Sequence, residues 1–202
     1  RLSNDRIEGY RNFANKLWNA ARFVRSNLDG YRPALARKSP PTLAERWIMS
    51  RLQQTVLDTR QALAKFRFND AASAIYQFLW HELCDWYVEI AKRSLYQSED
   101  PVARAVTQRT LVECLEVTLR LLHPFMPFLS EEIWQRLPHA GDSIVVAPFP
   151  RAADARRNTQ AERRMQPVID VVSAIRTIRS ESRISPGAEL RVSVRPGASG
   201  AN

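Results

Sequence analysis

The feature that most constrains the fold is a stretch of 28 residues, 69–96, that is apolar on two adjacent faces of a predicted helix. One stripe follows helical spacing through Ile75, Leu79, Leu83, Trp86 and Ile90, and a second runs through Tyr76, Trp80, Cys84, Val88 and Ala91. A helix with two adjacent apolar faces normally lies between neighbours rather than on top of them. The sequence therefore predicts a central helix in an all-α bundle, with Trp80 in its core.

The rest of the chain supplies the neighbours of that helix. Apolar periodicity, helix caps and prolines predict further helices at 4–27, 42–65, 101–123, 130–137 and 158–182. Short connections between long helices favour antiparallel neighbours. We expect a mostly α protein with an antiparallel helical bundle at 1–137, a linker at 138–157 and a small α/β appendage at 158–202. The appendage combines the last helix with a strand at 190–194, where apolar and polar residues alternate.

Two apolar sets give specific expectations about burial. The last helix has a predicted core stripe at Met165, Val168, Val172, Ile175 and Ile178. The string HPFMPFLSEEIW (residues 123–134) predicts a proline-bracketed corner and a helix start at Ser130. We expect this corner to bury Phe125, Phe128 and Trp134 in the bundle.

Charge indicates an acidic partner. The net charge is +9, the isoelectric point is about 10.2, and no run of five basic residues forms a tail. Nucleic acid is the commonest partner of such a basic protein. Cys84 and Cys114 lie far apart in apolar runs, which favours free thiols over a disulfide. No apolar run is long enough to span a bilayer, and the chain begins without an initiator Met, as expected for a piece of a longer protein.

No catalytic motif is visible in the sequence. There is no glycine-rich phosphate loop, and His81, His123 and His139 do not have the spacing of metal ligands. We expect no catalytic residues, no metal and no cofactor in this chain.

Two residues of the first helix lie outside its core stripe. Lys16 and Phe23 are seven positions apart, so they lie within about 20° on one helix face. A cation beside an aromatic that can stack on an unpaired base is typical of proteins that bind RNA loops. The alternative is that Phe23 packs under the loop at 28–41 and Lys16 is only solvated.

Asp85 and Glu89 interrupt the apolar pattern of the central helix one turn apart. They could form an acid/base pair, they could accept hydrogen bonds from base amino groups, or Glu89 could simply pair with Lys92 or Arg93. Arg176, Arg179 and Arg183 form a stripe on the last helix that suits a phosphate backbone. An arginine stripe is also common on a solvated helix face, so both interpretations stay open.

Several strings resemble a known family. HPFMPFLSEEIW resembles the anticodon-binding helical bundle of class Ia aminoacyl-tRNA synthetases. EGYRNFANKLWNAARFV (8–24) and CDWYVEIAK (84–92) are similar to the valyl-tRNA synthetases, and TLAERWIMSRL (42–52) and IRTIRSE (175–181) agree. The resemblance covers nearly the whole chain.

This resemblance implies a binding function. By position in the family's motifs, anticodon bases of a valine tRNA would be read by Lys16, Phe23, Val88 and Glu89, with Asp85 as a weaker member. The arginine-bearing helix near 176–183 would lead toward the tRNA stem. The family's catalytic domain, which uses ATP, and its editing domain are not in this sequence; they would belong to the same polypeptide. The resemblance also implies a cytoplasmic protein, and we expect a monomer. The rival hypotheses are the same domain from an isoleucyl or leucyl enzyme, and a helical protein–protein scaffold.

Overall fold

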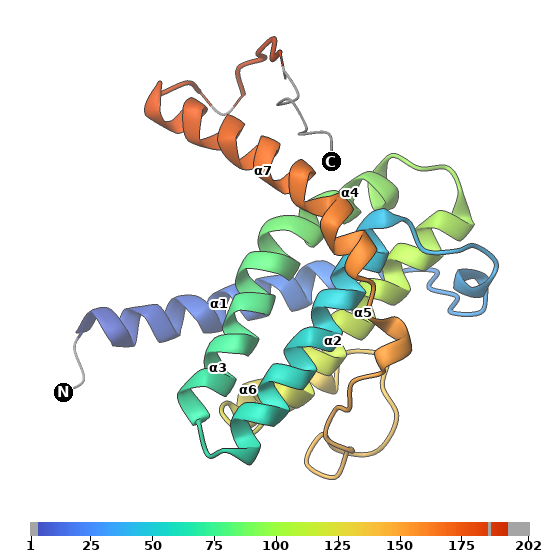
Figure 1. The fold of residues 1–202 in the computed structure, drawn as a ribbon. Helices are drawn as coiled ribbons and strands as arrows, with labels where there is room; N and C mark the ends of the chain where they lie inside the picture. The colour runs from blue at the N-terminus through green and yellow to red at the C-terminus, as the bar shows by residue number, and fades with distance from the viewer. Residues whose placement is uncertain (1–3, 186, 194–202) are drawn as a thin grey trace, which may run out of the picture.

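A computed structural model describes residues 4–185 and 187–193 of the chain. The long helices are α1 (Asn4–Ser26), α2 (Leu43–Ala64), α3 (Phe68–Tyr76), η2 (Gln77–Tyr87), α4 (Val88–Tyr96), α5 (Pro101–Leu122), α6 (Pro127–Trp134) and α7 (Thr159–Glu181). Two short 3₁₀ helices, η1 (Leu35–Arg37) and η3 (Asp154–Arg156), lie in the connections. The expected helical bundle is confirmed, and α1 and α7 project beyond it in Figure 1.

The central helix is continuous from α3 through η2 to α4, and η2 is a π-helix. At its end the Val88 N–H donates to the carbonyl of Leu83, five residues earlier. In an α-helix, each step of four residues overshoots a full turn by about 40°. The wider turns of η2 offset this drift. A single buried face therefore has a constant spacing of four, at Ile75, Leu79, Leu83, Tyr87, Ala91 and Leu95.

This change of period corrects the predicted stripe in the second half of the helix. Tyr87 is buried, whereas Trp86 and Ile90, which were predicted on the core face, are only half-buried. Trp80 is also half-buried, so the prediction that it lies in the core is wrong. The π turns thus bring Trp86 to a position where another element can reach it.

The core lies between α1, α2, the central helix and α5. Its largest fully buried side chains include Leu17, Ile48, Phe78, Leu115 and Trp134. The indole N–H of Trp134 donates to Glu116 at 2.9 Å. Cys84 and Cys114 are buried free thiols, as predicted. Burial raises the pKa of Cys84 to about 12, and it also raises the pKa of Cys114.

The start of α2 is capped as the sequence predicts. Thr42 and Glu45 form a capping box, in which the Thr42 N–H donates to the Glu45 carboxylate at 2.7 Å. Glu45 is buried, and it also accepts a hydrogen bond of 2.9 Å from the Thr107 hydroxyl on α5. A cap that satisfies its own helix end thereby joins α2 to α5.

Helix α7 packs on α2 through its first turns. Asn158 caps it, and the Asn158 N–H donates to the Ser50 hydroxyl at 2.7 Å. The Arg51 guanidinium bridges Glu82 of η2 at 2.8 Å and Glu162 of α7 at 3.5 Å. Polar side chains of α2 therefore fix the base of α7.

Beyond its base, α7 extends away from the bundle (Figure 1). Of its predicted core stripe only Met165 is buried, whereas Val168 is 47% and Ile178 is 58% exposed. The stripe prediction is wrong because the outer half of this helix is covered only in part: Trp86 of η2 lies against Arg176, and Val172 and Ile175 are half-buried.

Two further expectations are corrected. Residues 190–193 and the apolar patch 144–146 form no strand, so the described residues show no α/β appendage; Val194 lies outside them. Phe128 is 90% exposed, not buried. Helix α6 begins at Pro127 rather than at Ser130, which turns Phe128 outward, while Trp134 remains in the core as expected. The boundaries of the predicted bundle, linker and C-terminal segment, at 138 and 158, stay predictions.

Candidate nucleic-acid interface

Lys16 of α1 and Asp85 of η2 form an ion pair on the side where the two helices pack. The Lys16 Nζ lies 2.7 Å from the Asp85 Oδ1, and each side chain is about one-third exposed. The other carboxylate oxygen of Asp85 lies 3.3 Å from the His81 Nδ1. The Lys16 ammonium also lies over the Trp80 ring, 4.6 Å from its centroid. One cation therefore contacts a carboxylate and an aromatic face at once.

Aromatic rings extend this group toward the N-terminal part of α1. Phe13 stacks on Tyr76 with the ring centroids 5.4 Å apart, and Tyr76 stacks on Trp80 at 5.5 Å. Phe13 is buried, whereas Tyr76 and Trp80 are half-buried. The stack therefore begins in the core and ends at the surface beside Lys16.

Phe23 lies two turns further along α1. It packs half-buried against the core, and its ring meets the edge of Tyr96 at a centroid distance of 6.5 Å. Tyr96 is 63% exposed, and its hydroxyl accepts a hydrogen bond of 3.1 Å from the Asn27 amide. Phe23 is therefore less exposed than its place outside the core stripe predicts, because the end of α4 lies against it.

The remaining predicted residues of the central helix separate in space. Glu89 is exposed and pairs with Lys92 at 2.7 Å, which was one of the alternatives for this carboxylate. Val88 is only 9% exposed and belongs to the core. The structure thus brings Lys16 and Asp85 together, leaves Glu89 on the surface, and turns Val88 inward. We name the set Lys16, Phe23, Trp80, Asp85 and Tyr96 the α1 band.

The three arginines of α7 have different surroundings. The Arg176 guanidinium lies 4.6 Å from the centroid of Trp86, the ring that η2 turns outward. Arg179 donates to the carbonyls of Ser185 and Ala188 at 2.6 and 3.0 Å, so it holds the segment that follows α7 against the end of the helix. Arg183 is exposed and has a φ of 51°, in the left-handed region. Only Arg176 and Arg183 present their charge chiefly to the surface.

Sequence reasoning missed Trp80 and Tyr96 as members of this surface. Trp80 was assigned to the core by extending an α-helical period through a π-helix. Tyr96 lies at the end of α4, where no motif marked it. An exposed aromatic at a helix end is the signal that could have indicated Tyr96.

The described residues contain no cluster of three potential metal ligands, and none of their helices is long and apolar enough to cross a membrane. The surface described above has the chemistry of a binding site: a cation, two carboxylates and partly exposed rings.

Comparison with known proteins decides the family. Residues 45–194 match the model for the anticodon-binding domain of tRNA ligases. This chain belongs to that family. The match begins in α2 and includes the central helix and α7.

Curated relatives agree with this assignment. The chain is 47% identical to the valine–tRNA ligase of Geobacter sulfurreducens and 39% identical to that of Geobacillus stearothermophilus. The alignments cover 94% and 96% of this chain but only 22% of each relative. The chain therefore corresponds to the anticodon-binding part of these enzymes.

A solved structure shares the fold. The LeuRS–tRNA–LeuAMS ternary complex of Agrobacterium radiobacter matches with a TM-score of 0.50 and 21% identity, over 74% of this chain and 17% of that chain. At this identity the similarity supports the helical fold alone.

Proposed function

We propose that this chain binds the anticodon stem-loop of a valine tRNA through the α1 band. It would thereby orient the tRNA for aminoacylation by a catalytic domain outside this chain. The observation that carries the proposal is the group formed by Lys16, Asp85 and Trp80 in a member of the anticodon-binding domain family. Its role is binding and positioning, and ATP would be used by the catalytic domain, in a cytoplasmic, monomeric enzyme.

The chemistry of the α1 band suits an unpaired RNA loop. Sequence-specific RNA recognition usually targets splayed bases, which stack on aromatic or arginine side chains and hydrogen-bond along their edges. Tyr96 and the exposed part of Phe23 offer one stacking surface, and Trp80 offers a second beside Lys16. Lys16 and Phe23 are seven residues apart, or about 10 Å along α1. Two loop bases could therefore be held at separate points.

The carboxylates supply the base-reading groups. Asp85 accepts a hydrogen bond from Lys16, and Glu89 accepts one from Lys92. A carboxylate can instead accept from the amino group of cytosine, while the released lysine pairs with a phosphate or a base oxygen. Exchange of one partner for another leaves no buried charge unpaired. We expect Glu89 to contribute discrimination more than affinity.

The test is the affinity for stem-loops that carry valine, isoleucine or leucine anticodons. Stacking is worth about 1–3 kcal/mol per base, so Phe23→Ala should weaken binding of the valine stem-loop about tenfold to a hundredfold. Because Phe23 is half-buried, Phe23→Leu serves as the second variant: it keeps an apolar group and removes the stacking face. Lys16→Ala should add to the loss.

The control is Phe128→Ala, which removes a ring that is more exposed and lies on α6. It should change neither affinity nor melting temperature. The proposal fails if Phe23→Leu has both the melting temperature and the stem-loop affinity of the wild type. Equal affinity for the three stem-loops would favour a scaffold. A preference for the isoleucine or leucine anticodon would reassign the tRNA.

A further inference from the structure

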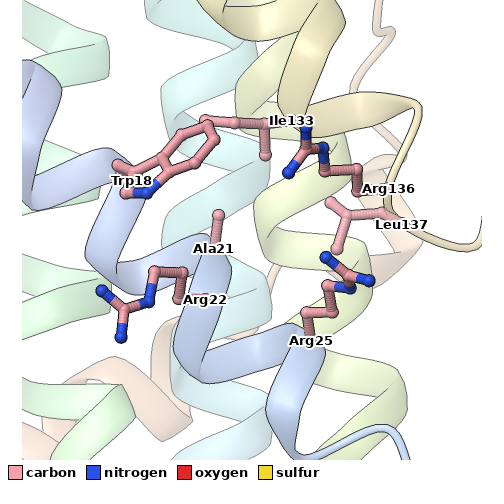
Figure 2. A pocket seen from close by; sticks show the side chains of 7 residues that line it. All are labelled: Trp18, Ala21, Arg22, Arg25, Ile133, Arg136 and Leu137. Carbon is pink, nitrogen blue, oxygen red and sulfur yellow. The ribbon is translucent and has the colours of Figure 1, made fainter.

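A second basic site lies on the other side of α1. Trp18, Ala21, Arg22 and Arg25 of α1 face the end of α6, where Ile133, Arg136 and Leu137 complete a small recess (Figure 2). In a helix of 3.6 residues per turn, Arg25 lies about 180° and Trp18 about 160° around α1 from Lys16. The recess is therefore separate from the α1 band.

Three arginines line this recess beside an apolar floor, and in Figure 2 the Arg22 guanidinium points away from those of Arg25 and Arg136. Figure 2 shows Trp18 pointing toward Ile133, with Arg136 and Arg25 along the α6 side. The Arg136 guanidinium lies 5.5 Å from the centroid of Trp18 and pairs with Glu132. Within the described part of the chain, Arg22 and Arg25 have no ion pair or side-chain hydrogen bond. Two of the three cations that line the recess thus have no carboxylate partner, and a bound anion would offset their charge.

The size of the recess indicates the kind of anion. Its volume is about 30 Å³, room for one or two water-sized groups. One or two oxygens of a phosphate fit this volume. Guanidinium groups present several N–H donors in a planar fork that matches phosphate oxygens. The stacked Arg136 is already held in place by Trp18, so little side-chain entropy is lost when it binds.

We propose that Arg22, Arg25 and Arg136 bind backbone phosphates of the same RNA whose loop occupies the α1 band. This inference rests on the proposed function, and it adds that the RNA crosses α1 and contacts both of its sides. Contacts to phosphate carry no sequence information. The recess would therefore add affinity and register, while base discrimination stays with the band.

The test compares Arg22→Gln/Arg25→Gln with Arg37→Gln/Lys38→Gln. Both double variants remove two exposed charges, but the second pair lies at η1. Binding of fluorescent stem-loops is measured between 50 mM and 1 M salt. Each lost phosphate contact should lower the salt slope by about 0.7–0.9. The Arg22/Arg25 variant should thus lose about 1.4–1.8 in slope and about 25- to 60-fold in affinity at 0.1 M salt, equally for every anticodon.

Three results would overturn the site: a wild-type slope and affinity in the Arg22/Arg25 variant, an equal loss in the Arg37/Lys38 variant, or a change in anticodon discrimination. The first result would favour a protein contact at the recess.

A second measurement separates this site from the proposed function. Inorganic phosphate is titrated while the indole N–H signal of Trp18, assigned with Trp18→Phe, is followed by NMR. We expect a saturable shift that disappears in the Arg22/Arg25 variant. If the wild type shows no anticodon preference but this shift is present, the proposed function is contradicted and the proposed phosphate site is supported. If there is no shift, the site fails even where anticodon preference is found.

Discussion

Helices α5 and α7 have nearly the same length, 22 and 23 residues, yet they are used differently. Helix α5 buries thirteen residues, and α7 buries only Ala161 and Met165. Helix α5 contacts α1, α2, α4 and α6, whereas the main partner of α7 is α2. A stripe of apolar residues is therefore necessary for burial but does not secure it, because the stripe also needs neighbours.

The two helices are also held by different forces. Helix α5 is fixed mainly by apolar packing, with Leu111, Leu115 and Leu119 almost inaccessible to water. The base of α7 is fixed by charged and polar contacts through Arg51, Ser50 and Asn158. Apolar burial stabilises in proportion to the area removed from water, so the outer half of α7 contributes little to the stability of the bundle.

The largest expected effect is the truncation of a leucine in α5. Leu115→Ala should lower the free energy of unfolding by about 2–5 kcal/mol, because it leaves a cavity in a packed core. The matched change in α7, Ile178→Ala, should cost no more than about 0.5 kcal/mol, as is usual at exposed positions. Urea unfolding followed by circular dichroism measures both. Equal losses of unfolding free energy in the two variants would show that the outer half of α7 is covered in solution. That result would contradict the difference between the two helices.

A smaller effect is expected where α7 joins the bundle. Arg51→Met keeps much of the side-chain volume and removes the hydrogen bonds to Glu82 and the ion pair with Glu162. Hydrogen bonds to charged groups contribute about 1.5–3 kcal/mol, and partial exposure of the pair places the loss toward the lower end. Hydrogen exchange should accelerate in the first turns of α7 more than in α5. Faster exchange in α5 instead would mean that Arg51 stabilises the bundle itself.

The smallest effect concerns the buried thiol of α5. Burial raises the pKa of Cys114 above its ordinary value of 9.0, and α7 has no cysteine. A group with a raised pKa in the folded state contributes full stability below the unfolded pKa and loses it as pH rises. The free energy of unfolding should be flat up to about pH 9 and then fall by at most about 1.4 kcal/mol per pH unit for this thiol.

The measurement is urea unfolding at several pH values for the wild type and for Cys114→Ala, whose difference isolates this thiol. A Ser173→Cys variant supplies an exposed thiol on α7. At pH 8 a disulfide reagent should label that thiol, and the native Cys114 should stay unlabelled. Rapid labelling of Cys114 would contradict its burial.

The candidate site was predicted from sequence only in part. Lys16, Phe23 and Asp85 were found because they do not fit the core stripes of their helices, and this argument needs no tertiary structure. Trp80 was assigned to the core and Tyr96 was not considered. The first error comes from η2, because i→i+5 hydrogen bonding changes which residues share a face, and no residue type in 77–87 indicates it. The second arose because no motif marks the end of α4.

The sequence by itself determined the helices, the capping box at Thr42 and Glu45, the buried state of both thiols and the family. These depend on local hydrogen bonding, on apolar periodicity and on strings of residues, all of which are properties of short segments. Tertiary structure decided which stripes are covered, which partner each charge has, and that Arg22 and Arg25 of α1 line one recess with Arg136, which follows α6. Residues more than a hundred positions apart come together there, and no local pattern records the distance between them. Burial and pairing depend on two segments in contact, whereas a sequence pattern describes one segment at a time.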